Sequence, residues 1–189
     1  MSTSTPAESP ATESETKTVQ AVVHRVADDL AMIIDRPVTL RDVQVSRVSS
    51  RAAGSGRVHI SFKLQLQRDG EERQGSLLIP LPDAIALSGY LMMMPDDAVL
   101  EHRGDDTLDR ATKDAILEVG NFVGGAVDAA LREQFDGAVR AKSIGCQGVR
   151  ADVRPAFVYA EGEELLLARA TARVHEFDAF ELILMLPAL

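Results

Sequence analysis

The sequence is poor in the residues that build disulfide frameworks and metal sites. Its 189 residues include one cysteine, four histidines and no tryptophan. The lone cysteine, Cys146, excludes an internal disulfide framework and is typical of a reducing compartment such as the cytoplasm. The histidines, at positions 24, 59, 102 and 175, do not have metal-ligand spacing. We therefore expect no metal site in this chain.

Long apolar runs and net positive charge are also missing. No segment of the sequence is apolar for long enough to span a bilayer, and its start has no signal-peptide pattern. The formal net charge is −9, and such a surface repels the phosphates of nucleic acids and anionic membranes. Neither nucleic acid nor membrane is therefore an expected partner, and a folded protein partner in the cytoplasm is favoured. Plain solubility explains an acidic surface equally well.

The first 18 residues differ from the rest of the chain in composition. They contain no branched aliphatic and no aromatic residue. A segment with so little apolar surface cannot offset its ordering entropy, so residues 1–18 are predicted to be a disordered tail. Residues 19–189 are long enough for a hydrophobic core and are predicted to form one domain.

The domain reads as helices and strands in a regular order. Apolar residues recur at threes and fours in the predicted helices, over residues 19–36, 84–94 and 108–135. The predicted strands come in two groups of three, over residues 38–48, 58–67, 75–81, 149–159, 165–175 and 179–186. Residues 96–107 are predicted to be a polar loop, and residues 135–148 an inserted loop. This order, α-βββ-α-α-βββ, predicts an α+β fold with helices packed on one face of an antiparallel sheet.

The last predicted strand bears on oligomeric state. The run from Phe180 to Pro187 is long and apolar, and an open edge of that kind invites pairing with another chain. We expect a second copy of the chain to cover it in a two-fold homodimer. The alternative is that this strand is interior to the sheet of one subunit.

The long helix carries a narrow polar stripe. At about 100° per residue, the stripe is about 80° wide and consists of Asp114, Glu118, Asn121, Gly125, Asp128 and Arg132. The rest of the circumference is apolar, and we expect it to be buried, Leu117 included. Asn121 is a poor helix former, and a glycine such as Gly125 costs up to about 1 kcal/mol relative to alanine in a helix interior. These identities favour a functional stripe, although an ordinary solvent face has the same spacing.

The stripe resembles the signature of a known family. Asp114-x-x-x-Glu118-x-x-Asn121 is similar to the (Asp/Ser)-x-x-x-Glu-x-x-Asn motif of the CheC/CheX/FliY chemotaxis phosphatases, and Glu118 to Gly125 resembles their Glu-x-x-Asn-x-x-x-Gly core. Residues 77–91 resemble the family's strand and short helix. Pro155 resembles the proline that opens the strand after the long helix. Because the first helix has no second Glu-x-x-Asn, the chain looks most like CheX, with one site per subunit.

The resemblance implies an aspartyl-phosphate protein phosphatase. Its substrate would be a phosphorylated CheY-like response regulator, whose receiver domain supplies Mg²⁺, and this chain would bind no cofactor. Asn121 would orient the attacking water, since a carboxamide both donates and accepts hydrogen bonds. Glu118 would pair with the receiver's lysine. Asp114, Gly125 and Asp128 would contact the partner.

Other functions stay open. One is a non-catalytic adaptor or motor-switch-type module of the same fold that docks a receiver, and another is a dimeric scaffold without a receiver partner. A thiol nucleophile at Cys146 is disfavoured because no base is identifiable. Residues 92–94, three methionines, are predicted to be core or helix-contact surface. The aspartates at 105, 106 and 109 are predicted to cap the long helix rather than to bind Ca²⁺.

Overall fold

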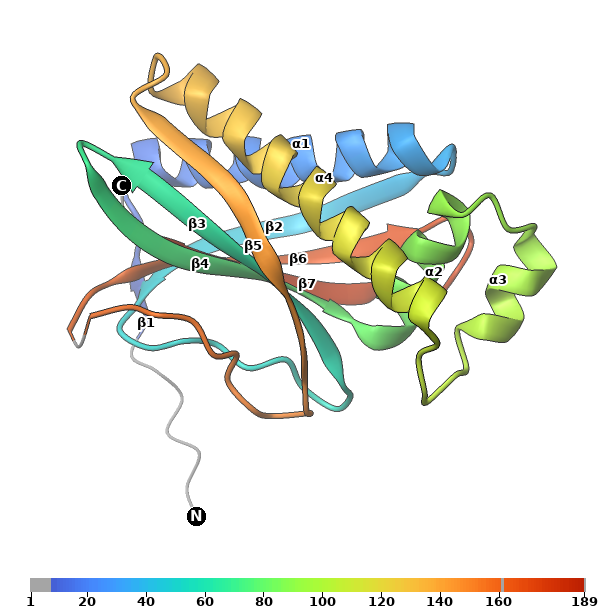
Figure 1. Cartoon of the computed structure of the whole chain (residues 1–189). Coiled ribbons are helices and arrows are strands. Elements are labelled where there is room, and N and C mark those ends of the chain that lie inside the picture. Colours follow the sequence, from blue (N-terminus) through green and yellow to red (C-terminus); the bar gives the residue numbers. More distant parts are fainter. Residues whose placement is uncertain (1–7, 161, 189) are drawn as a thin grey trace.

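The chain folds into one sheet with helices over one face (Figure 1). A computed structural model describes residues 8–160 and 162–188. In these residues the helices are α1 (Glu13–Ile34), α2 (Leu81–Leu91), α3 (Asp96–His102) and α4 (Arg110–Gln134). The strands are β1 (Glu8–Pro10), β2 (Val38–Val48), β3 (His59–Arg68), β4 (Glu71–Pro80), β5 (Val139–Val149), β6 (Leu165–Val174) and β7 (Phe180–Pro187). The predicted α+β class is confirmed.

The sheet has the strand order β1-β2-β6-β7-β4-β3-β5, and all of its pairs are antiparallel. β7 therefore lies inside the sheet, hydrogen-bonded to β6 and to β4. Its apolar side chains are covered within one chain, so the expectation that a second copy covers this strand is wrong. The alternative, an interior strand, is correct. The homodimer itself stays a prediction, and β7 no longer supports it.

The helices bury the side chains that alternate along the strands. Ile60, Phe62 and Leu64 of β3 lie in the main core together with Val119 and Val123 of α4. α1 and α4 cross the same face of the sheet (Figure 1), so α4 is buried along one side and open along the other. None of the described helices is long and apolar enough to cross a membrane.

Loops cover part of the opposite face. Phe157 is buried against strand residues such as Leu78 and Met185. The guanidinium of Arg51 lies 5.8 Å from the ring centre of Phe157, and its Nη1 donates to the carbonyl oxygen of Pro155 at 2.8 Å. The predicted strand over 149–159 is therefore wrong beyond its first residue: the segment is a covering loop.

The predicted inserted loop, residues 135–148, is also wrong for most of its length. Residues 139–149 form β5, which pairs with β3 and has a register shift opposite Phe62 and Leu64. Gly145, at φ 109°, takes a backbone conformation that L residues rarely adopt. An edge strand with glycines and exposed polar residues lacks the apolar signal of a central strand. Because the strand after the long helix is β5, the resemblance of Pro155 to the family proline does not hold.

The predicted disordered tail is wrong for residues 8–18. β1 pairs with β2, and α1 begins at Glu13 behind a capping box. The backbone nitrogen of Thr12 donates to Glu15 Oε2 at 2.9 Å, and the backbone nitrogen of Glu15 donates to Thr12 Oγ1 at 3.2 Å. Backbone pairing and capping order this segment without large apolar residues. The rest of the predicted tail, residues 1–7, lies outside the described residues.

The segment between the two helices is more ordered than predicted. Residues 96–102 of the predicted polar loop form α3. Asp109 caps α4 as predicted, because its Oδ1 accepts from the backbone nitrogen of Thr112 at 2.7 Å. Asp105 instead lies with its Oδ2 2.7 Å from His102 Nδ1. Of the three methionines, Met94 packs against the core, whereas Met93 is 90% exposed.

Candidate functional site

The outer side of α4 presents the polar stripe to solvent. Asp114, Glu118, Asn121 and Gly125 are exposed, while the valines on the other side of the helix are buried. The stripe therefore lies on a helix whose position is fixed by the core. A rigid helix places its outer side chains with little conformational freedom, as a site requires.

Two glycines on the inner side of α4 are explained by packing. A Cβ atom on Gly124 would lie 2.4 Å from the backbone nitrogen of Ser143 on β5. A Cβ atom on Gly120 would lie 3.2 Å from Cδ1 of Phe62. These glycines let β5 and β3 approach the helix closely. The exposed Gly125 is different, because a Cβ atom there would have nothing within 4 Å.

Asn121 and Glu118 form a hydrogen-bonded pair on the stripe. Asn121 Nδ2 donates to Glu118 Oε2 at 2.9 Å. In the described part of the chain no other hydrogen bond involves either side chain, which leaves Asn121 Oδ1 and Glu118 Oε1 accessible. A carboxamide held in this way can accept from a water, and the second carboxylate oxygen can accept from a cationic partner.

The two aspartates of the stripe differ in their surroundings. The side chain of Asp114 is 67% exposed, and its Oδ2 lies 3.7 Å from Arg110 Nε. The side chain of Asp128 is only 16% exposed. Its Oδ1 accepts from the backbone nitrogen of Ala141 at 2.8 Å and from Arg140 Nε at 3.0 Å. Asp128 thus fastens β5 to α4, and its predicted contact with a partner stays a prediction.

Leu117 was expected to be buried, but it is 45% exposed. It lies one turn before Asn121 and about 60° around the helix from Asp114, at the margin of the stripe. Its exposure could have been predicted from that angle, because a leucine so close to the polar stripe lies partly outside the buried side of the helix. The exposed surface around Asn121 therefore contains an apolar side chain as well as acids.

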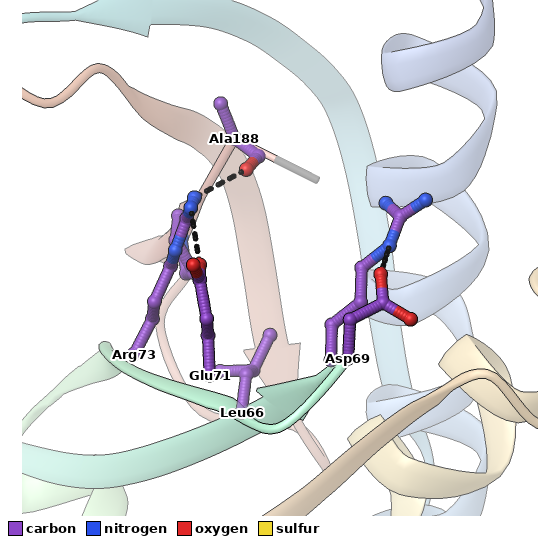
Figure 2. A pocket seen from close by; sticks show the side chains of 7 residues that line it. Leu66, Asp69, Glu71, Arg73 and Ala188 are labelled. Carbon is purple, nitrogen blue, oxygen red and sulfur yellow. Dashed lines mark hydrogen bonds and ion pairs between the residues drawn. The ribbon is translucent and has the colours of Figure 1, made fainter.

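A hollow lies away from the stripe, at the β3–β4 hairpin and the end of β7 (Figure 2). Its charged side chains are already paired. Arg68 Nε lies 3.6 Å from Asp69 Oδ2, and Arg73 Nη2 lies 3.1 Å from Glu71 Oε2. Arg73 Nη1 also donates to the carbonyl oxygen of Ala188 at 3.3 Å. A ligand would have to displace these partners, so the hollow is a weaker candidate than the stripe.

The remaining reactive side chains do not form a site with the stripe. Cys146 is half-buried on β5, and burial raises the pKa of its thiol, which disfavours the nucleophilic thiolate. His59 is buried on β3, and burial lowers the pKa of its imidazole. Among residues 8–160 and 162–188, no three His, Cys, Asp or Glu side chains lie close enough together to hold a metal ion.

No protein-family model and no curated protein matches the sequence. Solved structures share the fold. FliY from Thermotoga maritima matches with a TM-score of 0.67 and 13% identity, over 94% of this chain and 92% of that chain. A CheX chemotaxis protein from Desulfovibrio desulfuricans matches with a TM-score of 0.57 and 16% identity, over 91% and 99% of the two chains. A chain of the FliG–FliM complex from H. pylori matches with a TM-score of 0.58 and 10% identity, over 94% of both chains.

These matches define the class of fold. The chain has the CheC/CheX/FliY-type fold, which a chain of the FliG–FliM complex shares, and the predicted resemblance is confirmed at that level. At such identities the likeness concerns the fold alone, and function has to be argued from the stripe.

Proposed function

We propose that the chain hydrolyses the aspartyl phosphate of a CheY-like receiver domain. The main support is the Asn121–Glu118 pair, hydrogen-bonded at 2.9 Å and exposed on the open side of a helix whose other side is buried in the core. A phosphorylated receiver already holds an activated acyl phosphate, Mg²⁺ and a lysine. What its hydrolysis lacks is a water held in line with the scissile bond, and positioning of this kind is the main task in phosphoryl transfer.

The reaction requires no covalent intermediate on this chain. Asn121 Oδ1 accepts a hydrogen bond from the water and aligns it with phosphorus. The water oxygen forms the new bond to phosphorus as the bond to the aspartyl oxygen breaks. The products are the receiver's free aspartate and inorganic phosphate. Mg²⁺, held by the receiver, stabilises the charge that develops on the phosphoryl oxygens.

The two oxygens of Glu118 have separate tasks in this proposal. Oε2 keeps the amide of Asn121 in place. Oε1 accepts from the receiver's lysine and so sets the register of the two proteins. Asp114, Leu117 and Gly125 surround the pair with an acid, an apolar contact and a notch without a Cβ atom, and all three are exposed. A partner of this kind places the activity in the cytoplasm.

The proposal is tested by the decay of a phosphorylated receiver. The CheY-like regulators of the same organism would be labelled with ³²P-acetyl phosphate in Mg²⁺, and loss of label followed with and without the purified chain. We expect acceleration by the wild type, and a loss of about 10²-fold or more with Asn121→Ala. The matched control is Gln134→Ala, which removes an exposed carboxamide from the end of the same helix. Decay unchanged by the wild-type chain would contradict the proposal.

A non-catalytic module is the second candidate. It is favoured by the fold shared with a chain of the FliG–FliM complex. An adaptor would bind the phosphorylated receiver and leave its decay unchanged. Binding measured by titration calorimetry beside the decay assay therefore separates the two functions.

A further inference from the structure

The turn between α2 and α3 contains a methionine that folding alone does not explain. Met93 has φ 61°, in the left-handed region, directly after the C-cap of α2. Glycine is the usual residue at this position, because a side chain there is strained. The side chain of Met93 is also 90% exposed. Strain and exposed apolar surface both disfavour this residue unless something outside the chain covers it.

α3, which follows this turn, also exposes an apolar side chain. Val99 is its one buried residue, and Leu100 is 61% exposed. Asp97 and Glu101 are exposed, lie four residues apart on its outer side, and form no ion pair in the described residues. Their two carboxylates make this side of α3 acidic. We call Met93, Asp97, Leu100 and Glu101 the acidic corner.

Ion pairs anchor the two ends of α3, which carries most of the acidic corner. Arg36 Nη2 lies 3.0 Å from Asp96 Oδ1, and Arg103 Nη2 lies 2.8 Å from Asp83 Oδ1, whose side chain is 1% exposed. The guanidinium of Arg103 also lies 4.0 Å from the ring centre of Phe177. A surface fixed in this way loses little conformational entropy when a partner binds.

A surface of opposite charge lies on two loops at the ends of β3 and β5. Val58 is 40% exposed and Val153 is 49% exposed. Beside them lie three exposed arginines that form no ion pair within the described ranges, Arg57, Arg150 and Arg154. The backbone nitrogen of Asp152 donates to the carbonyl oxygen of Gly54 at 2.8 Å and joins the two loops. We call Arg57, Val58, Arg150, Val153 and Arg154 the basic loops.

The two surfaces match in charge and in apolar content, and no ion pair joins them within the described residues. α3 projects at the right of Figure 1, whereas the loops at the start of β3 and the end of β5 lie at the bottom of the view. We propose that the acidic corner of one copy of this chain binds the basic loops of a second copy. The contact is heterologous, because different surfaces of the two copies meet. It is independent of the phosphatase proposal.

The composition of the surfaces sets the strength of the contact. Each offers two exposed apolar side chains, so the buried area falls at the low end of specific interfaces, below about 1,200 Å². Much of the attraction comes from exposed charges and is screened by salt. The association is therefore weak and depends on ionic strength.

The test is the molar mass of the full chain by sedimentation equilibrium over a concentration series. At about 0.1 M salt, where the Debye length is about 10 Å and the long-range repulsion between two chains of net charge −9 is largely screened, the average mass should rise with concentration above that of one chain. At about 1 M salt, where the length is about 3 Å, it should return to one chain. A single-chain mass at every concentration in low salt would overturn the proposal.

Charge reversal identifies the surfaces. Asp97→Lys with Glu101→Lys gives one variant, and Arg150→Glu with Arg154→Glu gives another. Each variant alone should stay at the mass of one chain, because its acidic corner and its basic loops then carry charges of the same sign. Their equimolar mixture should associate, because the intact corner of one meets the intact loops of the other. Association of either variant alone, or no association of the mixture, would exclude these surfaces.

Met93→Gly separates binding from folding. Glycine relieves the left-handed backbone strain, so the melting temperature should rise, while loss of the apolar side chain should weaken association several-fold. A variant that is less stable, or that associates as the wild type does, would contradict the role of Met93.

Discussion

The two sides of α4 use glycine for opposite reasons. On the inner side, Gly124 is required because the backbone of β5 occupies the space of a Cβ atom. On the outer side, Gly125 has open space around it and weakens the helix without a compensating contact from any residue that the structure describes. The inner side is explained by the fold, and the outer side is not. Gly125, next to Asn121 and Glu118, therefore belongs to the surface that the proposed function assigns to the receiver.

The largest effect is expected on the outer side, at Glu118. Glu118→Ala removes the predicted ion pair with the receiver and leaves its lysine unpaired at the interface. The loss should be about 2–5 kcal/mol, seen as a higher receiver concentration at half-maximal rate. Its control is Glu133→Ala, an exposed glutamate of α4 that lies outside the stripe. An unaltered saturation curve for Glu118→Ala would exclude the docking role.

On the inner side, Gly124→Ala should destabilise the fold. The added Cβ atom would meet the backbone nitrogen of Ser143 at 2.4 Å, and neither backbone can move without disturbing the sheet. Overpacking of this kind costs about 1–3 kcal/mol, measured by urea denaturation. A midpoint equal to that of the wild type would show that β5 is not tightly packed on α4.

Asp128→Ala tests whether the attachment of β5 is structural. The change leaves the backbone nitrogen of Ala141 without its 2.8 Å acceptor. We expect a loss of about 1–3 kcal/mol of stability, together with faster amide hydrogen exchange in β5. If stability stays constant and receiver binding falls, Asp128 belongs to the partner surface as the sequence predicted.

The smallest effect, with the opposite sign, is expected for Gly125→Ala. Because a Cβ atom there meets nothing within 4 Å, the helix should gain up to about 1 kcal/mol. Receiver dephosphorylation should become slower, since the notch is filled. A variant that is more stable and fully active would show that Gly125 is not needed for the receiver, and would contradict the functional role of the outer side of α4.

Strong apolar periodicity predicted most of the fold. The alternation in β3 and the helical spacing in α1 and α4 all correspond to elements of the structure. β5 was not predictable in this way, because its glycines, its polar residues and the shift in its pairing with β3 interrupt the alternation. Residues 150–159 showed the reverse error: their apolar side chains suggested a strand, yet Phe157 covers the sheet from a loop.

The candidate site was predicted through residue identity on one helix. Periodicity placed Asp114, Glu118, Asn121 and Gly125 on one exposed stripe, and the structure has them there. The attachment of Asp128 depends on β5, which joins the helix through the tertiary structure, so no local pattern could show it. The exposure of Leu117 depends on how much of the helix its neighbours cover.

The placement of Asn121 and Glu118 on one turn of one helix has a kinetic consequence. No second chain and no hinge closure is needed to assemble the pair, which is already hydrogen-bonded. Turnover should therefore be first order in the chain down to the lowest dilution, and receiver saturation should be hyperbolic, with a Hill coefficient of about 1. At low receiver concentration the chain would then dephosphorylate the receiver with a fixed rate constant. The level of phosphorylated receiver would be set by the rate at which the receiver is phosphorylated.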